Sequence, residues 1–254
     1  MGVRLSLVIP AYNEVSRLPL YLAAIRGYLG AEGAPTCEVI VVDDGSSDGL
    51  SGILGQLATD WPQLCLVRHD RNRGKGAAVR TGMLAAAGDW LLFADADGAT
   101  PIEEEGKLRW ALERGADIAV GSRVLGGAAS LAARVWHRRL CGRVFAWAVR
   151  GLLGLPVRDP QCGFKMFRRE VGLRLFGPCR DEGYLFDLEI LAGACDLGYR
   201  ITEIPVRWAE VPGSKVRLMR DGWRMVRGLW CLRRRPRTEL ARSALVPATE
   251  RSTI

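Results

Sequence analysis

Short apolar runs alternate with longer amphipathic stretches through the first half of the chain. The runs are rich in Val, Ile and Leu and read LSLVIP, VIVV, LCLV, WLLFA and DIAVGS. Continuous apolar strands separated by helices are typical of a parallel sheet that is covered on both faces. The pattern therefore predicts an α/β protein with a Rossmann-like, mostly parallel central sheet, and in such sheets ligands gather at the carboxyl ends of the strands.

The segments between these runs predict helices, with Ser47 and Thr100 as N-caps and Pro101 at a first helical position. The helices are expected at residues 17–29, 47–57, 75–87 and 101–114. A second block follows a Gly/Ala-rich loop and a basic, Trp-bearing stretch. In this block we predict a strand at 163–167, a helix at 186–197, a strand at 201–208 and a helix at 216–235.

The composition divides the chain into three parts. Residues 1–215 form the predicted α/β domain, residues 216–236 a basic amphipathic helix as a C-terminal elaboration, and residues 237–254 a polar tail that we expect to be disordered. The segment 200–242 carries twelve Lys or Arg against four Asp or Glu, an excess equal to the whole net charge of +8. A basic excess favours an anionic partner, which leaves a nucleotide, an acidic membrane or a nucleic acid open.

The predicted helix 216–236 has the character of a membrane-interface element. Its apolar and basic positions follow helical spacing side by side: Met219, Trp223, Val226 and Trp230, with Arg217, Arg220, Arg224 and Arg227. Such faces with interfacial Trp suit a helix that lies on anionic lipid. A helix that packs on the domain and leaves its arginines solvated fits the same pattern.

Cysteines and hydropathy bear on location. The seven cysteines are an odd number without a C-x-x-C pair, so they indicate reduced thiols instead of a zinc site or a disulfide framework. The first residues lack the layout of a cleavable signal, and no run approaches the roughly 20 apolar residues of a spanning helix. We therefore expect a cytoplasmic protein whose membrane contact is peripheral.

Acidic residues follow two of the predicted strands directly. VIVV leads into Asp43 and Asp44, and WLLFA leads into Asp95 and Asp97. A D-x-D pair after a buried strand suits a divalent cation that also binds a diphosphate. A lone pair of this kind is more often a turn or a helix cap, but two acidic sets at one sheet edge favour a ligand site.

Two further segments could bind a ligand or could simply be structural loops. Residues 72–76, NRGKG, combine glycines and two cations before a helix, which suits a phosphate or nucleotide and equally a solvated turn. Residues 10–14, PAYNE, end the first strand with an aromatic face and a carboxylate, which suit a nucleotide base or an ordinary loop.

Taken in order, the motifs resemble a known family. VIPAYNE, VVDDGSSDG, NRGKGAAVRTG, FADADGATP, GSR, DPQCGFKMF, FDLEIL and IPVRW…GSK are similar, from about residue 5 to residue 220, to the family 2 glycosyltransferases of the GT-A fold and to their polyprenyl-phosphate sugar transferase subgroup. DADGAT, QCGFK and FDLEIL look more like the glucosyl-transferring members than the mannosyl-transferring ones.

The resemblance implies a donor side of the site. The residues that it places around the base, ribose and diphosphate of a nucleotide sugar are Pro10, Tyr12, Glu14, Asp44, Lys75, Asp95 and Asp97. Among these, Asp95 and Asp97 are implied to hold Mg²⁺ or Mn²⁺. Mannosyl-transferring members often place a Gln two residues beyond the second Asp, where this chain has Ala99.

The resemblance also implies an acceptor side and an inverting reaction. Phosphates of donor or acceptor are implied to contact Arg123, Gln161, Ser214 and Lys215, and the residues implied to be catalytic are Asp97, Arg123, Asp159 and Asp187. Asp187 also fits a helix N-terminus, where acids are favourable. A phosphate acceptor has a second pKa of about 6 and is already anionic near neutral pH, which makes a strong general base less necessary.

The implied function is transfer of a hexose, with UDP-glucose favoured, to polyprenyl or dolichyl phosphate at the cytoplasmic face of a membrane. The enzyme would contact the membrane surface itself or bind a membrane-anchored partner. GDP-mannose as donor and a saccharide as acceptor remain alternatives. A basic nucleic-acid-binding protein is a further one, but it leaves the acidic strand ends unexplained, and we expect no nucleic-acid partner.

Overall fold

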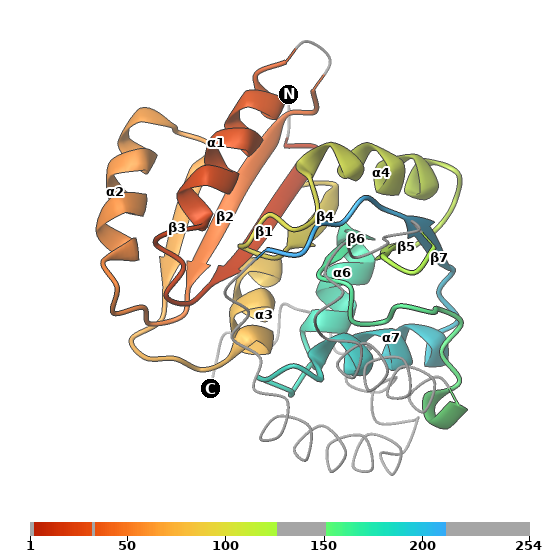
Figure 1. Cartoon of the computed structure of the whole chain (residues 1–254). Helices are drawn as coiled ribbons and strands as arrows, with labels where there is room; N and C mark the ends of the chain where they lie inside the picture. The colour runs from red at the N-terminus through yellow and green to blue at the C-terminus, as the bar shows by residue number, and fades with distance from the viewer. Residues whose placement is uncertain (1–2, 32–33, 126–150, 212–254) are drawn as a thin grey trace.

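A computed structural model describes residues 3–31, 34–125 and 151–211 (Figure 1). The predicted helix 216–236, the tail 237–254, the basic stretch before residue 151, and Ser214 and Lys215 lie outside these residues. Within the described ranges, no helix combines the length and apolar character needed to cross a bilayer.

The core of the protein is a seven-stranded sheet with the order β3-β2-β1-β4-β6-β5-β7. Its strands are β1 (Leu5–Ala11), β2 (Cys37–Asp43), β3 (Leu64–Arg68), β4 (Trp90–Ala94), β5 (Ile118–Ser122), β6 (Phe164–Arg168) and β7 (Ile201–Pro205). Strand β6 runs antiparallel to both of its neighbours, and the other pairings are parallel. The prediction of a mostly parallel Rossmann-like sheet is confirmed.

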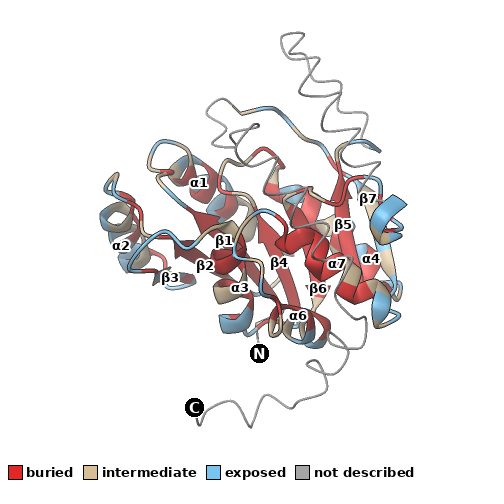
Figure 2. Cartoon of the chain, turned by 90° about the horizontal axis from the view of Figure 1, so that it is seen from below, coloured by how far each residue is buried: buried red, intermediate tan, exposed pale blue. Residues whose placement is uncertain are grey.

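Helices cover both faces of the sheet (Figures 1 and 2). They are α1 (Leu18–Leu29), α2 (Leu50–Asp60), α3 (Lys75–Ala85), the 3₁₀ turn η1 (Ile102–Glu104), α4 (Glu105–Glu113), α6 (Arg169–Phe176) and α7 (Phe186–Asp196). Buried residues of α1, α2 and α4 share one hydrophobic cluster with the sheet, and those of α3, α6 and α7 share another.

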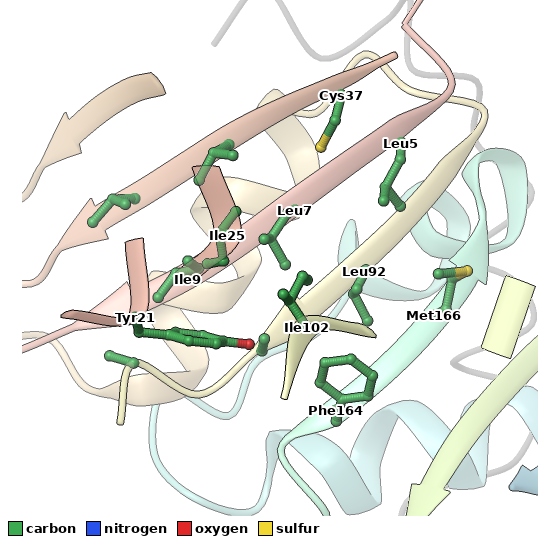
Figure 3. Packing of buried hydrophobic residues seen from close by; sticks show 14 of the residues in the cluster. Leu5, Leu7, Ile9, Tyr21, Ile25, Cys37, Leu92, Ile102, Phe164 and Met166 are labelled. Atoms are coloured by element: carbon green, nitrogen blue, oxygen red, sulfur yellow. The ribbon is translucent and has the colours of Figure 1, made fainter. Parts of the chain in front are cut away.

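Strand β1 shows why the apolar runs are continuous. Leu5, Leu7 and Ile9 point into the cluster beneath α1 and α4 (Figure 3), whereas Val8 between them points into the cluster beneath α3. Successive side chains of a strand face opposite sides. Because both sides are covered by helices, every position in the strand is buried.

Three local predictions need correction. Helix α2 begins at Leu50 after Gly49, which has a φ of 87°, so Ser47 is not its N-cap. Pro101 does not begin a helix but stands at the N-cap position of the short η1 turn. Thr100 lies one residue before that position and is therefore not a cap. Helix α6 was not predicted, because its eight residues are too few to show a helical period.

Candidate active site at the carboxyl edge of the sheet

The strand directions bring the predicted site residues to one edge. Strands β1, β2, β4 and β5 end there because they are parallel, and their register pairs Ala11 with Asp43 and Val8 with Phe93. Strand β6 starts at the same edge because it runs the other way, with Phe164 opposite Ala94. The loops after the parallel strands therefore meet the loop that precedes β6.

Asp95 is the first residue after β4, and the neighbouring loop fixes its position. Its backbone N–H donates to the carbonyl of Gly163 over 3.0 Å, and its half-buried carboxylate lies 2.6 Å from the ammonium of Lys75. A Cβ at Gly163 would lie only 2.0 Å from Oδ2 of Asp95. The glycine thus makes room for the carboxylate.

Asp97 stands beside Asp95 at the same edge and accepts a hydrogen bond from the N–H of Ala99 over 3.1 Å. Burial raises the pKa of Asp97, and the charge of Asp95 raises it further, while Arg17 and Lys75 offset this only in part. The charge on Asp97 is therefore incompletely compensated. Two such carboxylates supply the hard oxygen ligands that Mg²⁺ and Mn²⁺ prefer, so the residues fit a divalent cation.

Within the described residues, no three or more His, Cys, Asp or Glu side chains are grouped so that they could hold a metal ion. A cation held by Asp95 and Asp97 would therefore draw further ligands from water or from the phosphate oxygens of a bound molecule. This open coordination is typical of ions that act on phosphates.

Arg17 is a cation at this site that the sequence did not reveal. Its guanidinium forms a two-pronged ion pair with the buried Glu14, at 2.6 Å from Nε and 2.5 Å from Nη2. The hydrogen bond with Glu14 raises the pKa of Arg17, and the charges of Asp97 and Asp95 contribute to the rise. The only signal in the sequence was its spacing of three residues from Glu14, which is common at a helix start.

Lys75 belongs to a series of charges that alternate in sign. Burial opposes its charge, but the carboxylates of Asp95 and Asp187 outweigh that cost and raise its pKa. Asp187 in turn accepts a hydrogen bond over 2.6 Å from Lys165, which is 1% exposed and also donates to the carbonyl of Cys162. The order Asp95, Lys75, Asp187, Lys165 neutralises each buried charge with its neighbours.

Arg123 and Asp159 form a second ion pair on the other side of the D-x-D loop. Two guanidinium nitrogens donate to Asp159 over 2.8 and 2.7 Å, and the backbone N–H of Arg123 donates over 3.0 Å. These contacts outweigh burial and lower the pKa of Asp159. Glu203 of β7 accepts the N–H of Asp159 over 2.8 Å, and the guanidinium lies 5.7 Å from the ring centre of Trp208.

Asp44 organises the loop that leads into α3. It is 2% exposed and accepts hydrogen bonds from His69 over 2.7 Å and from the backbone N–H groups of Arg73 and Gly74 over 3.0 and 2.8 Å. A carboxylate has about four acceptor positions, so three are in use within the chain. Its position relative to a nucleotide base stays a prediction.

The glycines of NRGKG serve a close contact between two loops. The N–H groups of Gly76 and Ala77, in the first turn of α3, donate to the carbonyls of Gly183 and Glu182 over 3.0 and 3.3 Å. A Cβ at Gly74 would lie 2.2 Å from the carbonyl oxygen of Glu182. The motif therefore packs the start of α3 against residues 181–183. Of the motif's groups, the ammonium of Lys75 is the one that could bind a phosphate.

The remaining predicted residues lie at the same rim. Pro10 lies in the last, buried part of β1, and Tyr12 just after the strand is 39% exposed. Gln161 lies in the loop before β6, where its side-chain amide donates to the carbonyl of Tyr184 over 3.3 Å. The predicted residues of the described ranges thus come from the ends of β1, β2, β4 and β5, the loop before β6 and the first turns of α3 and α7.

The sheet order, with a carboxylate pair after β4 beside β1, is that of the Rossmann-like GT-A fold. Residues 6–175 match the family described as Glycosyl transferase family 2. The chain therefore belongs to this family, and it is a glycosyltransferase.

Several similar proteins share the name dolichyl-phosphate beta-glucosyltransferase. The dolichyl-phosphate beta-glucosyltransferase of Drosophila melanogaster is 40% identical over 227 residues, which cover 85% of this chain and 70% of that protein. The human enzyme of the same name is 38% identical over 225 residues, with 84% and 69% covered. The Saccharomyces cerevisiae one is 33% identical over 246 residues, with 90% and 74% covered.

Solved structures share the fold at lower identity. Glucosyl-3-phosphoglycerate synthase from Mycobacterium tuberculosis, in complex with uridine diphosphate, has a TM-score of 0.64 and 22% identity, with 97% of this chain and 82% of that chain covered. The mannosyltransferase PcManGT from Pyrobaculum calidifontis, in complex with GDP-Man and Mn²⁺, has a TM-score of 0.57 and 21% identity, with 88% and 60% covered.

Proposed function

We propose that this glycosyltransferase moves glucose from UDP-glucose to a dolichyl or other polyprenyl phosphate, with inversion at the anomeric carbon. The observation that carries the proposal is the pair Asp95 and Asp97 at the sheet edge, in which the charge of Asp97 is incompletely compensated. Lys75 pairs with Asp95, and the Arg123–Asp159 ion pair lies at the same edge. The names of the relatives support the glucosyl and dolichyl-phosphate parts of the proposal.

On the donor side, Asp95 and Asp97 hold Mg²⁺ or Mn²⁺. When bound, the ion neutralises charge that builds on the leaving diphosphate. The presence of Mn²⁺ and uridine diphosphate together in glucosyl-3-phosphoglycerate synthase supports this assignment. Lys75 and Arg17 add positive charge around the same phosphates, which stabilises a leaving group whose charge grows in the transition state.

The base and ribose are held by the loops after β1 and β2. Tyr12 offers an exposed ring for stacking, and aromatic stacking is tolerant of the base identity. Pro10, Glu14 and Asp44 bound the same space. Glu14 is held in place by its ion pair with Arg17, so the nucleotide and the diphosphate regions share one rigid contact.

On the acceptor side, Arg123 binds the phosphate of the lipid, assisted by Gln161. Asp159 orients Arg123 through its paired contacts, and because its pKa is lowered it stays ionised and is a weak base. Asp187 is buried and occupied by Lys165. The acceptor phosphate attacks as an anion, so the two carboxylates act by positioning the cations.

A lipid acceptor requires contact with a membrane. We propose a peripheral contact at the cytoplasmic face, made by the basic helix predicted at residues 216–236 or by a membrane-anchored partner. Replacing Arg224 and Arg227 with Glu should weaken binding to vesicles that contain anionic lipid. Co-sedimentation measures this, and unchanged partitioning would reject the contribution of the helix.

The test of the function is transfer of radiolabelled sugar from UDP-glucose and, separately, from GDP-mannose to a short polyprenyl phosphate, with Mn²⁺, with Mg²⁺ and with EDTA. We expect label in the lipid phase from UDP-glucose that EDTA abolishes. Label from GDP-mannose alone would correct the donor. Label that enters a soluble saccharide and never the lipid would correct the acceptor.

A further inference from the structure

Lys75 lies between two carboxylates at the edge of the sheet. Its ammonium is 2.6 Å from Oδ1 of Asp95, and the charge of Asp187 acts on it from a second direction. Asp187 has its own partner in Lys165 at 2.6 Å. Lys75 therefore pairs directly with the proposed metal site and also feels the charge of the buried pair behind it.

The contact with Asp95 conflicts with metal binding. A divalent cation of this class sits about 2.1 Å from a carboxylate oxygen, and Lys75 holds its ammonium against the same carboxylate. Two cations that close repel each other strongly in a partly buried site. An ion that binds Asp95 must therefore displace the ammonium of Lys75.

The ammonium of Lys75 can move away from Asp95 and still keep a negatively charged partner nearby. The backbone of α3 is anchored, because Gly76 donates to Gly183 over 3.0 Å and Ala77 to Glu182 over 3.3 Å. The lysine side chain is a flexible four-carbon stem, so it can turn while its backbone stays. Asp187 remains nearby as a second carboxylate for the ammonium.

We propose that Lys75 is a resident cation of the metal site: it pairs with Asp95 in the metal-free enzyme, gives way to the divalent ion, and then faces the donor diphosphate. This inference rests on the proposed function. When phosphates bind Lys75, its ion pair with Asp95 breaks and the carboxylate becomes free for the metal ion. When an ion binds Asp95, the same ion pair breaks and Lys75 becomes free for the phosphates. The lysine thereby makes metal and nucleotide binding mutually favourable, since such coupling is reciprocal.

The test measures Mn²⁺ affinity by calorimetry and by the signal of free Mn²⁺ in electron paramagnetic resonance, without nucleotide and with saturating UDP. In Lys75→Met without UDP, we expect Mn²⁺ to bind about tenfold more tightly than in the wild type. With UDP the two proteins should differ by less than about threefold, because the wild-type lysine is then engaged by the diphosphate.

Arg73→Met is the matched control. It removes one positive charge two residues away on the same loop, but its guanidinium pairs with Glu182 over 2.8 Å and has no contact with Asp95. We expect wild-type Mn²⁺ affinity in this variant. Lys75→Gln repeats the test with a polar side chain, and thermal unfolding confirms that each variant is folded.

The outcomes separate the two proposals. Mn²⁺ affinity that is unchanged or weaker in both Lys75 variants overturns the resident-cation role, and equal tightening in Arg73→Met does so as well, because it shows a diffuse charge effect. Failure of every protein to bind Mn²⁺, with UDP or with GDP, rejects the metal site itself and with it this inference. Tightening confined to the Lys75 variants and lost with UDP supports it.

Discussion

A single methyl group at Gly163 should disable the proposed metal site while leaving the fold intact. A Cβ there would lie 2.0 Å from Oδ2, 2.3 Å from Cγ and 2.5 Å from Oδ1 of Asp95, whereas ordinary contact begins at 3.4 Å. The carboxylate must therefore move by about 1.4 Å. Metal ligands tolerate errors of roughly 0.2 Å, so the displaced oxygens no longer fit an ion shared with Asp97.

We expect Gly163→Ala to lower Mn²⁺ affinity about 10- to 100-fold and transfer by roughly 100-fold. The free energy of unfolding should change by no more than about 1 kcal/mol, because the clash is with a side chain that can turn and the backbone of Gly163 is not left-handed. Calorimetry with Mn²⁺, lipid-phase transfer and urea unfolding measure the three quantities.

Gly172→Ala is the matched control. A Cβ at Gly172 would meet the Cδ1 atom of Leu91 at 2.9 Å, which is also a movable side chain, but in the core beneath α6 and away from the site. This variant should bind Mn²⁺ as the wild type does. A Gly163→Ala enzyme with normal Mn²⁺ affinity and turnover would show that Asp95 is not a metal ligand, and the assignment would be wrong.

Three further predictions follow from the site. Asp97→Ala should abolish transfer and leave the unfolding temperature within a few degrees of the wild type, and near-normal metal-dependent turnover would reject Asp97 as a ligand. The pKa of Asp159 is lowered in the folded state, so its ion pair with Arg123 stabilises the fold at pH values above the ordinary Asp pKa of about 3.9, and this stability is lost as the pH falls through the lower folded value. Asp159→Asn should therefore lower the free energy of unfolding by about 1.5–3 kcal/mol near pH 7 and make that free energy depend less on pH below about pH 4. Urea unfolding curves of the two proteins that keep the same difference in stability from pH 3 to 7 would contradict this. Gly76→Ala places a Cβ 2.3 Å from the carbonyl oxygen of Asp181, and because backbone must move it should destabilise the protein by about 1–3 kcal/mol and slow transfer; a wild-type melting curve would refute the loop contact.

The sheet was predictable because its signal is local. Strands β1, β2 and β4 are buried at nearly every position, so their residues are almost all apolar, and the run itself marks the strand. The same reasoning found β6 but not its direction. Antiparallel pairing of β6 depends on where the chain returns after residue 150, and no short pattern in the strand records that.

Helix boundaries were less predictable because caps were assigned from residue type alone. Ser47 has the chemistry of an N-cap, yet it lies before the helix, and its N–H donates to the side-chain oxygen of Asn13 over 2.9 Å. The side chain of Asp48 accepts a hydrogen bond from the N–H of Leu50, the first residue of α2, over 3.2 Å. The competition between neighbouring polar residues is decided by tertiary contacts such as these.

The site shows the same division between local and distant information. Asp95 and Asp97 follow a strand directly, so topology alone placed them at the ligand edge. The pairing of Arg123 with Asp159 joins residues 36 positions apart, and the charges of Asp95 and Asp97 act on Arg17 from a loop far along the chain. Such pairs are invisible to spacing, because only the folded sheet sets their distance.

The reversed strand explains how one sheet edge can carry both sides of the proposed site. If β6 were parallel, the residues before it would lie at the opposite edge, and the D-x-D loop would face only the loops after β1 and β2. Because β6 is antiparallel, the loop before it brings Asp159, Gln161 and Gly163 to the carboxyl ends of β4 and β5. Gly163 then shapes the proposed donor side through Asp95, and Asp159 shapes the proposed acceptor side through Arg123. One short loop therefore sets the geometry of both halves, so its substitutions should alter donor and acceptor binding separately according to which partner they touch.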